Sequence, residues 1–181
     1  MTPISKIMDQ DHLRRAITRI AHEILEKNKG TDQLCIVGIR TRGAVLAERI
    51  KQAIYTIEQV EVPVGILDIT LYRDDLTMIA SQPVVHETSI DFDIAGKCII
   101  LVDDVLFTGR TIRAALAQVM EFGRPKKVEL LVLVDRGHRE LPIRADYVAK
   151  NIPTSGKEVV EVRLSEQDGK DEVVIIEKDN E

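Results

Sequence analysis

The sequence predicts one α/β domain built around a mostly parallel sheet. Its 181 residues suit a single domain, and 44% of them are hydrophobic, which is enough to form a core. Short, unbroken aliphatic runs alternate with stretches of helical periodicity along the chain. Because the strands of a parallel sheet are covered on both faces, they read as continuous aliphatic runs, so this alternation favours helices on both sides of the sheet.

The first half of the chain provides the first elements of this alternation. A helix capped by Asp9 or Asp11 is expected to end near Lys29, where Gly30 follows as a stop signal. A buried strand, a helix and a strand with alternating polarity follow in this order: Leu34–Val37, Gly43–Ile54 and Val60–Leu71.

The second half begins with a polar, irregular stretch at Met78–Asp93, which we expect to be a mobile loop or a β-arm. A buried strand, a helix that ends before Gly123 and Pro125, another buried strand and two further strands follow: Cys98–Val102, Thr111–Glu121, Val128–Val134, Glu158–Leu164 and Glu172–Ile176.

The net charge of −5 is unevenly distributed. Glu158–Glu181 carries −6, so residues 1–157 carry +1, and a basic surface on that part is compatible with a polyanionic partner. Cys35 and Cys98 lie in apolar runs, which favours buried thiols in a reducing cytosol. No aliphatic run approaches the roughly 20 residues of a membrane span, and no secretory signal is visible. We expect a cytoplasmic protein.

One segment combines two carboxylates with a turn that suits a phosphate. An aliphatic run ends at Asp103-Asp104, and Thr108-Gly109-Arg110-Thr111 follows at the start of a helix. Adjacent carboxylates repel each other, but they suit neighbouring hydroxyls and a hydrated divalent cation. Gly109 lets the backbone approach a phosphate, to which the threonine hydroxyls and the helix N-terminus donate. The pattern favours a ribose 5-phosphate site; the alternative is an acidic loop in which Thr108 merely caps the helix.

Two further segments follow predicted strands, at the sheet edge where open parallel sheets bind ligands. Arg40-Thr41-Arg42 precedes Gly43 at a helix start, which indicates a second anion site. Val134–Pro142 is dense in hydrogen-bonding groups and could hold a base or nucleotide. We expect His138 in it to have a binding or structural role rather than that of a general base. For the first segment, the alternative is that the arginines are surface residues beside a helix. For the second, the alternative is a solvated loop with no direct role.

The acidic pair and the Thr-Gly-Arg-Thr turn resemble the PRPP-binding signature of the type I phosphoribosyltransferases. The resemblance implies one domain over residues 1–181 with that family's fold: a mostly parallel central sheet flanked by helices, a small hood, and a flexible loop. The loop would lie at about 72–93, and acidic strands would occupy 158–181. It also implies that Mg²⁺-bound PRPP is the substrate, with Asp103 and Asp104 on the ribose hydroxyls and as potential contacts of the cation. Arg42 would bind the leaving pyrophosphate.

Asp103, Asp104 and Arg42 are therefore expected to be catalytic. The residues expected to bind PRPP or UMP are Arg40, Thr41, Arg42, Arg73, Asp103, Asp104, Val105, Leu106, Phe107, Thr108, Gly109, Arg110, Thr111, Arg136 and Val160.

The first predicted helix has a basic face opposite its apolar one. Arg14, Arg15, Thr18, Arg19 and His22 share an arc of about 140° at 100° per residue. Such a face is ordinarily a solvated surface, but it also fits contacts to phosphates. Six aromatic residues are too few for a stacking platform of the usual single-strand type.

Three stretches carry a closer resemblance: Arg14–Glu23, Asp68–Leu76 and Asp135–Ser155. They are similar to a bacterial family of bifunctional pyrimidine-operon regulators that are also uracil phosphoribosyltransferases, and the match covers nearly the whole chain. It implies a homodimer or higher oligomer that binds the pyrimidine mRNA leader when UMP or UTP is bound. This binding would lower pyrimidine gene expression by attenuation, at the level of either transcription termination or translation. It also implies conversion of uracil and PRPP to UMP and pyrophosphate.

The RNA-binding residues implied are Arg15, Thr18, Arg19, His22, Arg139, Arg144 and Lys150. We expect the acidic Glu158–Glu181 end to lie away from this surface. Two alternatives remain: a plain base-salvage transferase, for uracil or a purine, with no RNA role, and a nucleotide-responsive RNA-binding regulator with vestigial activity.

Overall fold

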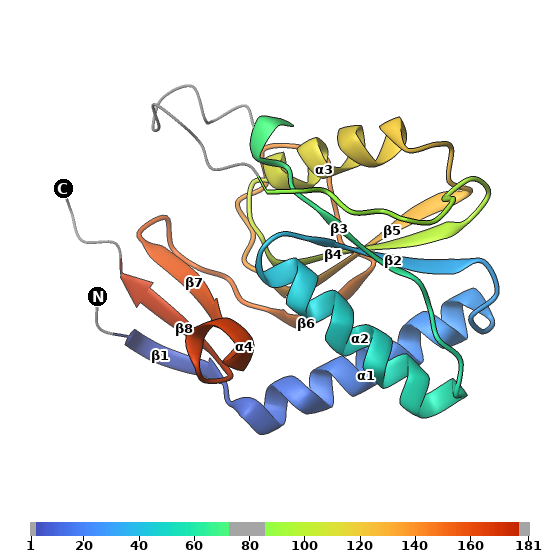
Figure 1. The fold of residues 1–181 in the computed structure, drawn as a ribbon. Helices are drawn as coiled ribbons and strands as arrows, with labels where there is room; N and C mark the ends of the chain where they lie inside the picture. Colours follow the sequence, from blue (N-terminus) through green and yellow to red (C-terminus); the bar gives the residue numbers. More distant parts are fainter. Residues whose placement is uncertain (1–2, 73–85, 178–181) are drawn as a thin grey trace.

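The computed structural model describes residues 3–72 and 86–177 of the chain. The strands are β1 (Pro3–Met8), β2 (Leu34–Ile39), β3 (Val64–Leu67), β4 (Cys98–Leu106), β5 (Lys127–Asp135), β6 (Tyr147–Asn151), β7 (Glu158–Arg163) and β8 (Glu172–Glu177). The helices are α1 (Gln10–Asn28), α2 (Arg42–Glu58), the 3₁₀ helix η1 (Thr70–Tyr72), α3 (Arg110–Glu121) and α4 (Ser165–Asp168). Five strands form one sheet in the order β3-β2-β4-β5-β6, and three form another in the order β1-β8-β7 (Figure 1).

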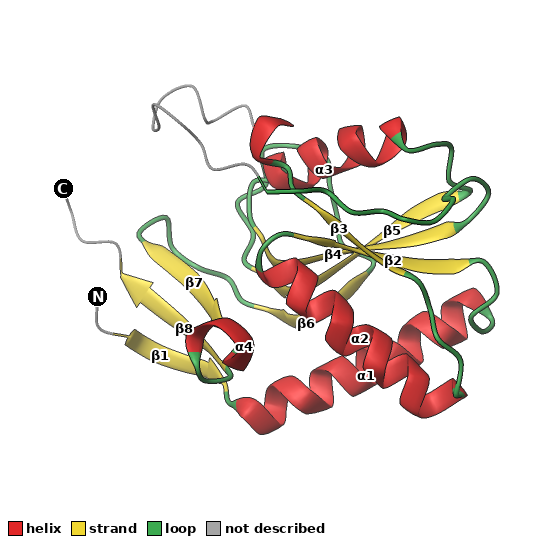
Figure 2. Ribbon diagram, in the orientation of Figure 1, coloured by secondary structure: helices red, strands yellow, loops and turns green. Residues whose placement is uncertain are grey.

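Every pairing in the five-stranded sheet is parallel. Helices α1 and α2 cover one face and α3 covers the other (Figure 2). Successive side chains of a strand point to opposite faces, so Ile100 and Leu131 pack in the core with α1 and α2, whereas Ile99 and Leu130 pack in the core with α3. The prediction of a parallel sheet covered on both faces is confirmed.

Helix α1 begins and ends where the sequence predicts. Asp9 caps it by accepting a hydrogen bond from the N–H of His12 at 2.9 Å, and Lys29 ends it in the left-handed region. Both cysteines are buried free thiols, and burial raises the pKa of each to about 11, so they remain protonated at neutral pH. No helix within residues 3–72 and 86–177 is long and apolar enough to span a membrane.

Most predicted strands end within two residues of the observed ones, but two of them differ by more. The strand expected over Val60–Leu71 is shorter, because the Asp68 carboxylate accepts from the N–H and hydroxyl of Thr70 and turns the chain into η1. Strand β4 runs beyond Val102, because the ladder with β5 continues through Leu106. The acidic pair therefore belongs to the strand itself. Strands β1 and β6 were not predicted; both are short edge strands with many exposed residues, which weakens the aliphatic signal.

The three-stranded sheet and α4 form a small separate layer beside the main sheet, which we call the hood (Figure 1). It contains the acidic strands, as expected, but its charges are paired with basic residues. Arg49 of α2 binds Glu166 and Asp171, and Arg163 binds Glu172. Asp171 also lines one groove with Arg14 and Thr18 of α1. Asp171 therefore lies beside the N-terminal half of α1, which departs at this point from the expectation that the acidic end lies away from the RNA surface.

A buried carboxylate joins the end of α1 to the sheet. Glu129 of β5 accepts hydrogen bonds from Lys127 (2.7 Å), Asn28 (3.0 Å) and the Tyr147 hydroxyl (2.6 Å). Burial alone would raise the pKa of Glu129, but these hydrogen bonds and the neighbouring Lys27 outweigh it and lower the pKa to about 2. Tyr147 is the first residue of β6, and its buried ring packs against the end of α1, with Lys27 Nζ 5.0 Å from the ring centroid.

Glu129→Gln is expected to lower the free energy of unfolding by about 1–3 kcal/mol at pH 7, because it removes charge-assisted hydrogen bonds. A folded-state pKa below the ordinary 4.5 contributes stability above about pH 4.5, and this contribution disappears as the pH falls toward about 2. Urea unfolding at pH 7 and at pH 2–3 should therefore show a difference that shrinks in acid. Glu26→Gln, an exposed change on α1, is the control; equal stability of the Glu129→Gln variant and the parent at pH 7 would contradict this role.

Candidate active site

A cavity of about 270 Å³ opens at the carboxyl ends of β2, β3 and β4. Open parallel sheets bind their ligands at this edge. The lining residues are Ile39, Arg40, Thr41, Arg42, Asp68, Ile69, Thr70, Asp103, Asp104, Val105 and Thr111. The structure thus brings the acidic pair, the arginine loop and the first turn of α3 into one site.

The backbone holds both carboxylates of the acidic pair. The N–H of Asp104 donates to Asp103 Oδ1, and the N–H of Val105 donates to Asp104 Oδ1, each at 2.9 Å. Asp103 is buried, and Asp104 is half-buried at the cavity wall. Ionised carboxylates accept several hydrogen bonds each, so this pair suits a ligand with neighbouring hydroxyls.

The loop between β2 and α2 lies beside the acidic pair. Gly38 stands opposite Val102 in the parallel ladder, so the residues after Ile39 run alongside Asp103 and Asp104. The peptide bond between Arg40 and Thr41 is cis. Gly43 allows α2 to begin directly against β4, because a Cβ at this position would lie 2.4 Å from the carbonyl oxygen of Val102. The loop therefore depends on glycine for its close approach to the acidic strand.

The two arginines of this loop retain donors for a ligand. Arg40 Nη2 donates to the Glu87 carbonyl at 3.2 Å, and Arg42 Nη2 donates to Asp168 at 3.0 Å. Among the described residues, the Nε atoms of both arginines are buried and have no hydrogen-bond partner. Leaving a buried donor unpaired costs about 1–3 kcal/mol. An anion in the cavity would provide the missing acceptors, in agreement with the anion site that the sequence predicts at this loop and with the pyrophosphate that the family resemblance implies.

The predicted phosphate turn is preformed at the start of α3. Gly109 has a φ of 93°, in the left-handed region that favours glycine. The carbonyl of Thr108 accepts from the backbone N–H groups of Glu140 (2.9 Å) and Leu141 (3.2 Å). The Thr108 hydroxyl accepts from the backbone N–H of Arg110 at 3.3 Å. Of the turn and the first residues of α3, Thr111 lines the cavity, and Thr108, Gly109 and Arg110 are not among its lining residues.

The side chains of this segment differ in their access to a ligand. Val105 lines the cavity, but Leu106 is buried in the core beside α3, so only its backbone can contact a ligand. Phe107 is exposed, and Arg110 is paired with Glu140 at 2.6 Å. Arg73, which the resemblance places near pyrophosphate, lies outside the described residues.

Asp68 is a residue of the cavity that the sequence analysis did not single out. Its carboxylate accepts hydrogen bonds from Thr70 and from the N–H of His86. Burial opposes the charge, but these hydrogen bonds prevail and lower the pKa of Asp68, so it stays ionised. The β2–β3 register, which pairs Ile39 with Leu67, brings Asp68 beside the arginine loop. A pattern within one strand gives no signal of this proximity.

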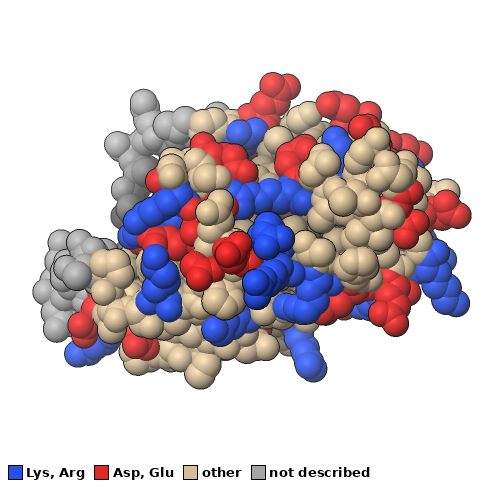
Figure 3. All heavy atoms as spheres, turned by 90° about the horizontal axis from the view of Figure 1, so that it is seen from below, with Lys and Arg blue, Asp and Glu red and all other residues tan. Residues whose placement is uncertain are grey.

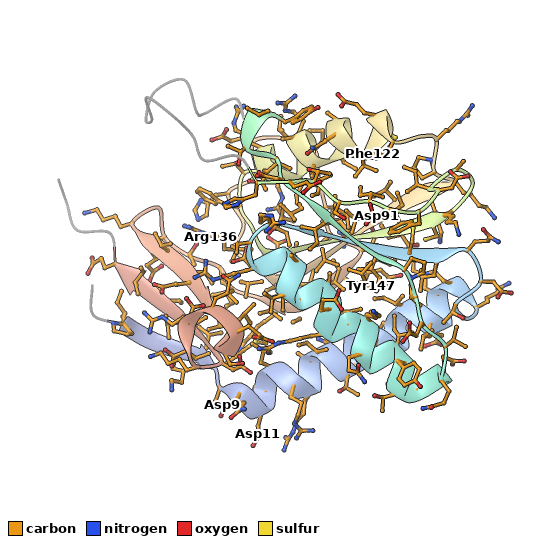
Figure 4. All side chains as sticks on the ribbon, viewed as in Figure 1. Asp9, Asp11, Asp91, Phe122, Arg136 and Tyr147 are labelled. Carbon is orange, nitrogen blue, oxygen red and sulfur yellow. The ribbon has the colours of Figure 1, made fainter. Side chains whose placement is uncertain are left out.

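The segment after β5 binds its own neighbours. Arg136 is 5% exposed and lies where the main sheet approaches β7 (Figure 4). Its guanidinium stacks on the Phe107 ring at 4.1 Å and donates to Thr154 and to the Glu158 carbonyl. Burial lowers the pKa of Arg136. His138 donates to the Thr154 carbonyl at 2.6 Å, which fits the expected structural role.

Val160 is buried in β7 and packs in the hydrophobic core, so its side chain is not on the cavity wall. Arg139 binds the Asp135 carboxylate and the carbonyls of Phe107 and Ile143. Arg139 therefore stabilises the loop around the phosphate turn. Within the described part of the chain, the side chains of the other residues expected to bind RNA donate no hydrogen bond to this loop.

Those other residues lie largely on one side of the molecule. Arg15, Thr18, Arg19 and His22 are exposed along α1. Arg19 also donates to the carbonyls of Val148 (3.3 Å) and Ala149 (3.1 Å), which brings α1 against the edge strand β6 and its exposed Lys150. The view from below shows lysine and arginine side chains gathered on this face, interspersed with acidic ones (Figure 3). Arg144 is exposed on the loop before β6.

Comparison with known proteins identifies the family. The phosphoribosyl transferase domain matches residues 3–167. The chain belongs to the phosphoribosyltransferase family. Relatives within this family include proteins named "Bifunctional protein PyrR". That of Pelotomaculum thermopropionicum is 62% identical over 96% of each chain, and that of Caldicellulosiruptor bescii is 59% identical over the full length of both. That of Thermus aquaticus is 60% identical over 97% of each chain.

Solved structures of other phosphoribosyltransferases have the same fold. A Trypanosoma cruzi hypoxanthine phosphoribosyltransferase superposes with a TM-score of 0.76 over 96% of this chain and 95% of its own, at 20% identity. A second structure of the enzyme from that organism gives 0.74 over 96% and 91%, at 19% identity. The predicted type I phosphoribosyltransferase fold is confirmed.

Proposed function

We propose that this chain is a bifunctional protein: a uracil phosphoribosyltransferase that makes UMP and pyrophosphate from uracil and PRPP, and a regulator that binds pyrimidine mRNA leader RNA when a uridine nucleotide occupies its active site. The observation that carries the enzymatic part is the shared cavity, where the acidic pair of β4 meets the arginine loop. Relatives named as bifunctional, at 57–62% identity, support the double role.

Each part of the cavity has a role in this transfer. The turn at Gly109 and Thr111 binds the 5-phosphate and fixes the sugar, so positioning supplies much of the rate. Asp103 and Asp104 hold the ribose hydroxyls and offset the positive charge that develops on the ribosyl carbon as its bond to pyrophosphate breaks. The donors of Arg40 and Arg42 stabilise the charge on the departing pyrophosphate.

The acid groups of the site fit Mg²⁺ that arrives with PRPP. Magnesium in such sites keeps several waters and binds one or two carboxylates together with substrate phosphates. Asp103 and Asp104 provide those carboxylates, and residues 3–72 and 86–177 contain no cluster of three or more acidic, histidine or cysteine side chains that would form a complete protein site. When bound, the cation would neutralise charge on the leaving pyrophosphate.

The enzymatic part is tested by incubating the purified full chain with uracil, PRPP and Mg²⁺ and measuring UMP and pyrophosphate. UMP formation supports the proposal, and guanine and hypoxanthine in place of uracil distinguish it from a purine-salvage transferase. A protein that uses only purine bases and binds no leader RNA would support the plain salvage alternative.

The RNA surface consists of the exposed face of α1 together with Lys150 and Arg144. Neutralising phosphates with such residues dominates affinity for RNA and makes it salt-dependent. Because Arg19 is tied to β6, the exposed Arg15 and His22 test this surface with less structural disturbance. A homodimer or higher oligomer would extend the surface across subunits, and the protein would act in the cytoplasm.

Arg15→Ala is expected to weaken leader-RNA binding about tenfold and to reduce the slope of log affinity against log salt by about one, with uracil turnover unchanged. His22→Ala should also weaken binding. Gel shifts at several salt concentrations in the presence of UMP measure both effects. Arg124→Ala removes an exposed charge from the loop after α3, beyond the opposite face of the sheet, and should leave RNA affinity unaltered. Parental RNA affinity in both the Arg15→Ala and His22→Ala variants would refute the assignment.

A further inference from the structure

A carboxylate of the hood reaches the arginine loop of the active site. We propose that Asp168, the last residue of α4, is a positioning residue that orients the Arg42 guanidinium for pyrophosphate. The proposal rests on the proposed function, because it requires Arg42 to bind the pyrophosphate group of PRPP. The proposal extends that function, because it assigns a residue of the hood to the pyrophosphate site.

The two oxygens of Asp168 have separate partners. Oδ1 accepts from Arg42 Nη2 at 3.0 Å, and Oδ2 accepts from the N–H of Leu164 at 2.8 Å. The second bond fixes the carboxylate to the start of α4, so its first oxygen is presented to Arg42 in one orientation. Both side chains are partly shielded from solvent, with exposed fractions of 33% for Arg42 and 23% for Asp168. A shielded, oriented pair constrains the guanidinium more than a surface ion pair does.

The rest of the Arg42 guanidinium is left for a ligand. An arginine has five N–H donors in a rigid plane, and Asp168 binds one end of this plane. Among the described residues, the buried Nε of Arg42 has no acceptor, although Arg42 lines the cavity. Fixing one end of a planar group sets the direction of the other donors. Asp168 therefore prepares Arg42 to donate to an anion without rearrangement of its side chain.

A second contact fixes α4 to α2. Arg49 lies seven residues after Arg42, about two helical turns further along α2. It binds Glu166 at 2.9 Å, Asp171 at 2.7 Å and the hydroxyl of Ser165 at 3.1 Å. This cluster attaches the hood to α2, whereas Asp168 contacts the residue in the active site. Attachment and orientation can therefore be tested separately.

Asp168→Ala is expected to weaken pyrophosphate binding and to raise the KM for PRPP, each by about tenfold, which corresponds to one charge-assisted hydrogen bond. UMP affinity should remain within about twofold, since UMP has no pyrophosphate group. The value of kcat should fall less than the KM rises. Asp168→Asn should recover part of the loss, because its amide oxygen can still accept from Arg42. Calorimetry of the full-length protein with Mg²⁺-pyrophosphate and with UMP, together with steady-state kinetics, measures these effects.

Glu166→Gln is the matched control, because Glu166 lies in the same helix but binds Arg49 instead. It should lower the melting temperature without changing pyrophosphate affinity. Unchanged pyrophosphate affinity in both Asp168 variants would overturn the proposal, as would an equal loss in Glu166→Gln or an equal loss of UMP binding. Failure of the parent protein to make UMP would refute the proposed enzyme instead, and pyrophosphate calorimetry would still decide the role of Asp168.

Discussion

Asp104→Asn should lower kcat for UMP formation by about 100-fold or more while leaving the fold intact. A group that stabilises developing charge in the transition state typically raises kcat by a factor of about 100–1,000. Asp104 lines the cavity beside Asp103, and its charge offsets that of the ribosyl carbon. Asparagine has the same shape and retains an oxygen for the Val105 N–H, from which Asp104 now accepts at 2.9 Å.

Initial rates at saturating uracil and PRPP measure the loss, and thermal melting verifies the fold. Asp32→Asn serves as the control, because Asp32 is exposed in the turn before β2, at the other end of the sheet. At a UMP concentration that saturates its site, the Asp104→Asn variant should still bind leader RNA, since Asp104 holds the nucleotide and is not part of the basic surface. Parental turnover in this variant is incompatible with the role assigned to the carboxylate.

Gly43→Ala should remove most of the enzymatic activity through the backbone alone. The added Cβ would lie 2.4 Å from the Val102 carbonyl oxygen and 3.2 Å from the Asp103 Cα, so α2 must move away from β4. Overpacking of this kind costs about 1–3 kcal/mol of stability. Because Arg42 immediately precedes Gly43, the same movement separates the pyrophosphate donors from the acidic pair, and a misplacement of about 1 Å can reduce the rate about 100-fold.

Urea unfolding and UMP formation in the same preparation test this prediction. Gly156→Ala is the control, because a Cβ there would meet no described atom within 4 Å and the residue has no positive φ. A Gly43→Ala protein with parental stability and turnover would show that the close approach of α2 to β4 has no importance for either.

The acidic pair and the arginine loop could be predicted to share a site because of the regularity of parallel sheets. Each lies at the carboxyl end of an aliphatic strand, and neighbouring parallel strands end at the same edge. The register of Gly38 with Val102 gives this proximity. The capping of α1 by Asp9 was predictable for a similar reason, because a cap depends on residues within one turn of the chain.

Contacts between distant segments could not be predicted in this way. Asp168 binds a residue 126 positions earlier, and this pairing depends on how the hood packs against α2. The sequence predicts Asp68 to lie within a strand that continues to Leu71. In the structure, its hydrogen bonds with Thr70 turn the chain out of the strand. Arg19 belongs to a basic helical face in the sequence, but it also binds backbone carbonyls of β6, an edge strand with too few buried residues to be recognised.

We propose that one nucleotide site serves both activities. The most direct test of this proposal titrates UMP into the purified protein and measures leader-RNA affinity by gel shift at moderate salt, alongside inhibition of UMP formation by added UMP. We expect UMP to raise RNA affinity over the same concentration range in which it occupies the active site. RNA affinity that is independent of UMP throughout the range in which UMP inhibits the enzyme would contradict the account.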